Sequence, residues 1–135
     1  VNHYNDIKGM TFALWGLAFK PDTDDIREAP ALYIIDKLLE LGANIVAYDP
    51  EAMDNVKAIY NDKIKFVDHQ YDNLKDADAL LIITEWSAFR NPDFAKISSS
   101  LKSPTIFDGR NLFNIEYMDG KGFYYESIGR KTILK

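Results

Sequence analysis

The sequence contains no cysteine among its 135 residues and only two histidines, His3 and His69. The absence of cysteine excludes a disulfide scaffold, a thiolate zinc site and a thiol nucleophile within this chain. Both histidines lie in polar contexts without acidic or nucleophilic neighbours at a telling spacing, so we expect them at the surface. The chain therefore has too few suitable histidines to favour a histidine metal site or a catalytic triad.

Basic charge and long apolar runs are also scarce. The chain has 16 Lys and Arg residues against 21 Asp and Glu residues, a net charge of −5, whereas nucleic-acid-binding domains usually present a basic face. The longest uncharged stretch, residues 10–19, is about half the length of a membrane span, and no secretory signal is recognisable. We expect a soluble, cytoplasmic protein with no nucleic-acid or membrane partner. Its length predicts one domain with an ordinary core.

The apolar pattern after residue 10 alternates between strand and helix. A helix beginning at Pro30 and ending before Gly42 has one apolar face at the helical spacing, and further helices are predicted at 51–60 and 93–101. That face comprises Ala31, Ile34, Ile35, Leu38 and Leu41. Short apolar runs predict strands at residues 11–16, 44–49, 64–67, 79–84, 105–108 and 122–127.

This alternation is typical of βαβ units. We predict an α/β fold, a three-layer Rossmann-like domain with a mostly parallel sheet of six strands and helices on both faces. The expected strand order is 3-2-1-4-5-6. The run 79–84 is apolar on both alternating sets, which indicates a central strand buried on both faces. In the last strand, Tyr124 and Tyr125 alternate faces, and we expect one of them in the core.

In such sheets, ligands bind outside the carboxyl ends of the strands, near the switch between the first and fourth strands. The loop 16–30 leaves the first strand there, but it has Gly16 alone and not the glycine fingerprint of a dinucleotide site. Asp49 ends the second strand where a ribose-binding acid would fall, although a strand-ending turn is the favoured interpretation. Lys20 and Arg27 flank an acidic run before the helix and could cradle phosphate oxygens. Solvated charges paired within the loop are an equal alternative.

Two other rim loops offer polar and aromatic side chains. Trp86 follows the fourth strand and could stack on a ring or simply cover the end of the sheet. Arg110 follows the fifth strand and could bind phosphate or carboxylate, or form an ion pair with Asp108 or Glu85. The acidic run at 22–25 does not match a calcium loop, so no metal site is predicted. The residues alone therefore predict a basic, aromatic-edged site for a phosphorylated ligand, with no identifiable nucleophile or general base.

The same loops resemble the UDP-glucose/GDP-mannose dehydrogenase family, in its C-terminal UDP-binding domain. The resemblance rests on residues 16–30 (GLAFKPDTDDIREAP), on Thr84-Glu85-Trp86 with Phe89, and on residues 107–111 (FDGRN) and 127–130 (SIGR), in the family's order. It covers nearly the whole chain, residues 9 to 131.

This resemblance implies an NAD-dependent oxidation of UDP-glucose to UDP-glucuronate, with two NAD⁺ used in succession and a Cys of another domain as nucleophile. It assigns Phe19, Lys20 and Arg110 to the substrate and Arg27 to NAD. Residues 1–8 then form the lead-in from an inter-domain segment, and residues 9–135 form the UDP-binding domain. The N-terminal NAD-binding domain and a second copy of the full chain, in a homodimer or higher homo-oligomer, are the implied protein partners.

The nucleophilic Cys and the glycine fingerprint of that family are absent here, so the chain alone is expected to be inactive. Three alternatives remain open. One is a sister dehydrogenase acting on UDP-N-acetylmannosamine or GDP-mannose, another is a stand-alone nucleotide-binding module, and a third is a structural assembly domain.

Overall fold

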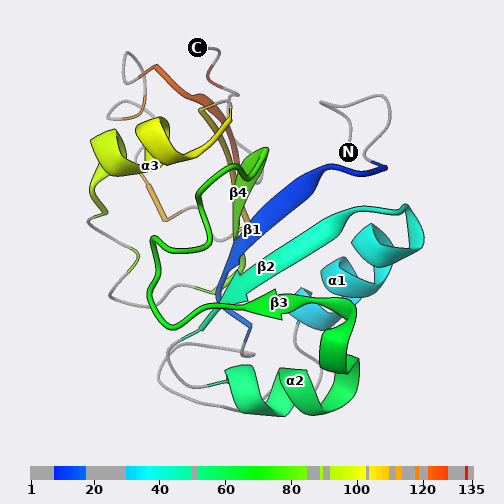
Figure 1. Ribbon diagram of the computed structural model, residues 1–135. Coiled ribbons are helices and arrows are strands. Elements are labelled where there is room, and N and C mark those ends of the chain that lie inside the picture. Colours follow the sequence, from blue (N-terminus) through cyan, green and yellow to red (C-terminus); the bar gives the residue numbers. More distant parts are fainter. Residues whose placement is uncertain are drawn as a thin grey trace.

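The computed structural model describes residues 8–17, 30–49, 52–84, 89, 92–102, 104–109, 112–113, 118, 122–127 and 133. Within these ranges, strands and helices alternate along the chain (Figure 1). The strands are β1 (Thr11–Trp15), β2 (Asn44–Tyr48), β3 (Lys65–Phe66), β4 (Ala79–Ile82), β5 (Thr105–Asp108) and β6 (Tyr124–Ser127). The helices are α1 (Pro30–Glu40), α2 (Met53–Tyr60) and α3 (Phe94–Ser100), with a short 3-10 helix, η1 (Asn61–Lys63), before β3.

The strands form one sheet in the order β3-β2-β1-β4-β5-β6, and every neighbouring pair is parallel. The predicted fold class and strand order are confirmed. An isolated antiparallel bridge joins Tyr125 of β6 to Ile133. Because β1 lies between β2 and β4, the strand order reverses at the β1–β4 pair, which is where ligands bind in this class of sheet.

The sheet separates two hydrophobic clusters. Along β1, Phe12 and Leu14 pack into one cluster with α1 and α2, whereas Ala13 and Trp15 pack into the other with α3. This is the two-residue alternation expected of a strand covered on both faces. Figure 1 shows α1 and α2 on one side of the sheet and α3 on the other. β4 contributes to both clusters, as its apolar pattern predicts.

The differences from the predicted boundaries gather at the ends of the elements. Five of the six predicted strands are one or two residues longer than the observed ones. Gly16, Asp49 and residues 83–84 follow the last residues of β1, β2 and β4, where the chain turns into the rim loops. The predicted strands 64–67 and 122–127 are observed as Lys65–Phe66 and Tyr124–Ser127. Leu41 is also not part of the buried helix face: its side chain is 38% exposed. The reason is that α1 ends at Glu40 and the chain then turns through Gly42, whose φ is +86°.

Single residues outside the rim follow the predictions where the structure describes them. His69 is exposed, whereas His3 lies outside the described residues. Of the tyrosine pair in β6, Tyr125 is fully buried and Tyr124 is half-buried. Among the described helices, none has the length and apolarity to cross a membrane.

Candidate functional site

The carboxyl ends of β1 and β4 touch at the switch point of the sheet. Gly16, the residue after β1, has a φ of +100°. A Cβ atom at this position would lie 2.5 Å from Thr84 Cβ and 2.6 Å from the Thr84 backbone nitrogen. Real Cβ atoms essentially never approach so closely, so glycine is required where the two strand ends pack together. The loop 16–30 therefore leaves the sheet directly beside the loop that follows β4.

Asp49, after β2, holds the start of that same loop. The residue is fully buried, and its Oδ2 accepts a hydrogen bond from the Leu17 amide at 2.7 Å. Its Oδ1 accepts from the Ala52 amide at 2.8 Å. The Gly16 amide donates to the Tyr48 carbonyl at 2.8 Å, so two consecutive amides of the loop bond to the end of β2. These contacts support the strand-ending turn and give the carboxylate a structural role rather than leaving it to a ribose.

The phenol of Tyr48 lies next to this carboxylate in the sequence. Partial burial and the negative charge of Asp49 both raise the pKa of Tyr48, burial contributing more. The phenol therefore stays neutral throughout the physiological pH range.

A second buried carboxylate, Asp108 at the end of β5, holds the loop after that strand. Its Oδ2 accepts hydrogen bonds from the Leu112 amide at 2.6 Å, the Phe113 amide at 3.2 Å and the Tyr125 hydroxyl at 2.6 Å. The Gly109 amide donates to the Ile82 carbonyl of β4 at 2.9 Å. The backbone on both sides of residues 110–111 is thus bonded to the sheet.

An aromatic cluster supports the rim from below. Trp15 stacks on Phe89 with ring centres 5.0 Å apart, and Tyr48 meets Phe89 edge-on at 6.2 Å. The Trp15 indole nitrogen donates to the Gln70 carbonyl at 2.6 Å. Phe89, the last residue of the motif that begins at Thr84, is fully buried and is therefore a core residue that anchors the loop after β4.

The four predicted site residues, Phe19, Lys20, Arg27 and Arg110, all lie outside the described residues, and so does Trp86. The structure does describe where their loops begin: β1 and β5 lie on either side of β4, and both loops leave from the carboxyl edge. In the described part of the chain, no three His, Asp or Glu residues gather in a way that could hold a metal ion.

Sequence reasoning missed the anchoring role of Asp108 and Tyr125. Asp108 entered the prediction only as a possible ion-pair partner of Arg110, and Tyr125 only as a candidate core residue. A signal was present in Asp108, an acid that ends a buried strand and precedes a glycine. Its three donors come from later in the chain, at residues 112, 113 and 125, and no local pattern links them to it.

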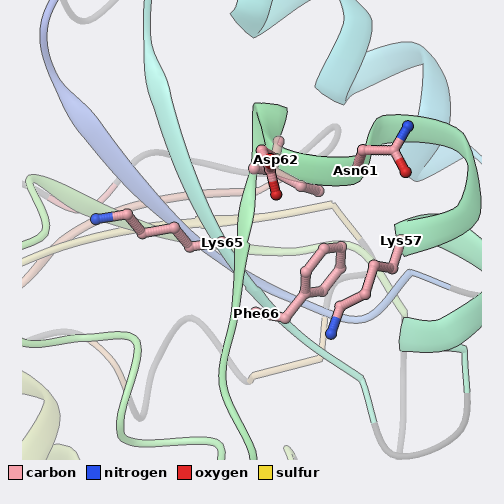
Figure 2. Close-up of a pocket in the computed structure, with 6 residues that line it drawn as sticks. Lys57, Asn61, Asp62, Lys65 and Phe66 are labelled. Carbon is pink, nitrogen blue, oxygen red and sulfur yellow. The ribbon is translucent and has the colours of Figure 1, made fainter.

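A groove of about 670 Å³ lies elsewhere, against α2, η1 and the edge strand β3 (Figure 2). Its lining includes two lysines, but Lys57 extends over the Phe66 ring, with Nζ 5.4 Å from the ring centre. Figure 2 shows Lys65 on the other side of the β3 ribbon from Lys57 and Phe66, so the two ammonium groups do not converge on one ligand position. This groove is at the β3 edge of the sheet, away from the β1–β4 switch point.

The sequence of this chain is similar to that of known proteins. Residues 13–115 match the model of the UDP-glucose/GDP-mannose dehydrogenase family, UDP binding domain. The UDP-glucose 6-dehydrogenase TuaD of Bacillus subtilis is 44% identical over 127 residues, which are 94% of this chain and 28% of that protein. The match to the family model begins within β1, includes β4 and β5, and ends at residue 115, within the segment between β5 and β6.

Two solved structures share the fold over almost the whole chain. A UDP-glucose dehydrogenase from the archaeon Pyrobaculum islandicum superposes with a TM-score of 0.76 and 27% identity, covering 93% of this chain and 26% of that one. A UDP-D-ManNAc dehydrogenase from Pyrococcus horikoshii gives a TM-score of 0.74 and 26% identity, covering 96% and 27%. The chain spans little more than a quarter of the length of each of these relatives.

Proposed function

Since this chain belongs to the UDP-glucose/GDP-mannose dehydrogenase family and corresponds to its UDP binding domain, we propose that it forms the UDP-sugar-binding part of a UDP-glucose 6-dehydrogenase. The observation that carries the proposal is the anchoring of the loops after β1 and β5 by two buried carboxylates at one edge of the sheet. The strands flank β4, so the loops start about 10 Å apart, two strand spacings. Side chains from both can therefore reach one nucleotide.

Each proposed site residue brings a group suited to a nucleotide sugar. Lys20 supplies a point charge for the diphosphate, and Arg110 supplies a planar fork that can bind two oxygens at once. Phe19 offers an apolar surface to the substrate. Arg27 is proposed to reach the NAD rather than the sugar nucleotide. The identity of 44% with a UDP-glucose 6-dehydrogenase favours UDP-glucose as the sugar nucleotide.

The NAD cofactor does not fit a self-contained site in this chain. Gly16 is the only glycine of the loop 16–30, and both oxygens of Asp49 accept backbone amides. We therefore propose that an N-terminal domain of the same enzyme binds most of the NAD and supplies the nucleophilic cysteine that this chain lacks. Residues 1–8 would lead in from that part, and residues 9–135 would form the UDP-binding domain. The full enzyme would act as a homodimer or a higher homo-oligomer.

Calorimetric titration of the chain tests this proposal, with UDP, UDP-glucose and GDP at up to millimolar concentration. We expect UDP and UDP-glucose to bind weakly and GDP to bind less, with no NAD reduction by the chain alone. A folded chain that binds none of the UDP ligands would contradict a self-sufficient uridine site. Folding is checked by circular dichroism on the same sample.

A sister dehydrogenase is the second candidate, and the near-equal TM-score of the UDP-D-ManNAc dehydrogenase favours keeping it. The two dehydrogenases are named for different sugar nucleotides but have the same fold, so the fold does not distinguish between the substrates. Tighter binding of UDP-N-acetylmannosamine than of UDP-glucose would select that enzyme, and a preference for GDP would select a GDP-mannose enzyme. A reading frame upstream of Val1 without a glycine-fingerprint domain and a cysteine would instead select a stand-alone nucleotide-binding module.

A further inference from the structure

Tyr125 connects the last strand of the sheet to the loop after β5. Its side chain is fully buried, and its hydroxyl donates to Asp108 Oδ2 at 2.6 Å. The same hydroxyl lies 3.3 Å from the Phe113 carbonyl oxygen. One phenol therefore touches both the carboxylate at the end of β5 and the backbone five residues further along the chain.

The Asp108 carboxylate is the centre of this arrangement. Three donors converge on its Oδ2, namely two amides of residues 112–113 and the Tyr125 hydroxyl. Hydrogen bonds to an ionised, buried acceptor are stronger and more directional than neutral ones, and bonds that share an acceptor depend on one another. If the Tyr125 hydroxyl is removed, the Asp108 carboxylate can shift, and the backbone of residues 112–113 that is bonded to it shifts as well.

Between the two bonded ends of this loop lies Arg110. The Gly109 amide is bonded to the Ile82 carbonyl just before it, and the Leu112 amide is bonded to Asp108 just after it. We propose that Tyr125 is a positioning residue which, through Asp108, sets the loop that carries Arg110 and thereby the affinity for the diphosphate of the sugar nucleotide. This inference rests on the proposed function, because it needs Arg110 to bind the ligand.

The chain offers a matched control for the Tyr125 hydroxyl. In the α1–α2 layer, the Tyr60 hydroxyl donates to Asp36 Oδ1 at 2.7 Å and lies 3.2 Å from the Leu32 carbonyl oxygen. Both phenols are buried, and each contacts one carboxylate and one carbonyl. The two differ in position, because Asp36 belongs to α1 and is not part of the carboxyl edge of the sheet.

The experiment compares Tyr125→Phe with Tyr60→Phe in the same chain, with UDP as the calorimetric probe. Both variants are expected to lower the thermal midpoint by roughly 3 to 8 °C, since each removes one hydrogen bond to a carboxylate. Only Tyr125→Phe is expected to raise the Kd for UDP, by about three- to tenfold, the range of coupling through packed networks. Tyr60→Phe should leave the Kd within about 1.5-fold of the parent value, since distant sites act independently.

A double-mutant cycle tests whether Tyr125 acts through Arg110. If it does, Tyr125→Phe raises the Kd in the parent chain but has little further effect when Arg110→Ala is already present. Equal effects in both backgrounds would indicate general loosening and overturn the inference. Equal Kd values for Tyr125→Phe and Tyr60→Phe would also overturn it, while the proposed function would stand. If the folded parent chain binds no UDP, the self-sufficient uridine site is contradicted, and this inference, which needs Arg110 to bind UDP, is overturned with it.

Discussion

Replacement of Gly16 by alanine tests the contact between the carboxyl ends of β1 and β4. Gly16 has a φ of +100°, and an added Cβ atom would lie 2.5 Å from the Thr84 Cβ, 2.6 Å from its backbone nitrogen and 2.7 Å from its Oγ1. The nearest atoms belong to the backbone and to the root of a short side chain, which is fully buried at 1% exposure. Neither can rotate away. The methyl group therefore forces the two strand ends apart.

Two costs add in this variant. A non-glycine residue at positive φ costs about 1–2 kcal/mol, and forcing an extra methyl group into a packed site costs about 1–3 kcal/mol more. We expect Gly16→Ala to lower the free energy of unfolding by roughly 2–5 kcal/mol, a large part of the stability of an ordinary domain. Because the distortion arises where two rim loops begin, UDP affinity should fall as well.

Gly9, just before β1, separates the two costs. Its φ is +81°, but a Cβ atom there would meet nothing within 4 Å. Gly9→Ala should therefore show the backbone cost alone, about 1–2 kcal/mol, with unchanged UDP affinity. Urea unfolding followed by circular dichroism and by tryptophan fluorescence measures both variants. If Gly16→Ala is no less stable than Gly9→Ala, the contact between the strand ends does not restrict this position and the reasoning is refuted.

Charge, capping and ionisation give three further expectations. Lys20→Ala and Arg110→Ala should each weaken UDP-sugar binding by about 1–3 kcal/mol. The control Lys63→Ala, on the exposed η1, should leave the binding unchanged. Unchanged KM and kcat for both rim variants in the full enzyme would contradict the proposed substrate-binding roles of Lys20 and Arg110. Asp93 Oδ1 accepts an amide of the first turn of α3 at 3.1 Å, so Asp93→Ala should cost about 0.5–2 kcal/mol in urea unfolding; no loss would mean that α3 does not depend on this cap. Burial and a hydrogen bond to a carboxylate raise the pKa of Tyr60. As pH rises above about 10, the unfolded chain loses this proton before the folded chain does, so the free energy of unfolding should fall. Tyr60→Phe should make that fall with pH less steep in urea titrations at alkaline pH, and an equally steep fall would contradict the raised pKa.

The fold could be predicted because its signals are local and repeated. Short apolar runs identify the strands, the doubly apolar run of β4 indicates a strand covered on both faces, and the alternation of strands with helices then leaves few possible topologies. Element ends were less predictable, because tertiary contacts decide them. Leu41 fits the helical spacing, yet α1 stops one residue earlier, where the chain turns through Gly42. Propensity and spacing contain no information about that turn beyond the presence of glycine.

The site was predictable only in part, for a physical reason. The Lys and Arg residues of a rim loop can be recognised in the sequence by their residue type, and so can a loop motif. The groups that hold such a loop are buried acids whose partners are backbone amides, and every residue type except proline provides an amide. The contact of Asp49 with the amide of Leu17, 32 residues earlier, therefore has no counterpart in the pattern of side chains.

The two buried acids also bear on how an acidic chain can hold an anionic ligand. The net charge is −5, so the overall field does not attract a diphosphate, and attraction has to come from cations within a Debye length of it. Asp49 and Asp108 at the strand ends would oppose binding if their charges faced the ligand. Their oxygens instead accept amides and a phenol inside the protein. Because those donors offset the negative charge locally, Asp49 and Asp108 would oppose the binding of the proposed diphosphate less than carboxylates that face the ligand.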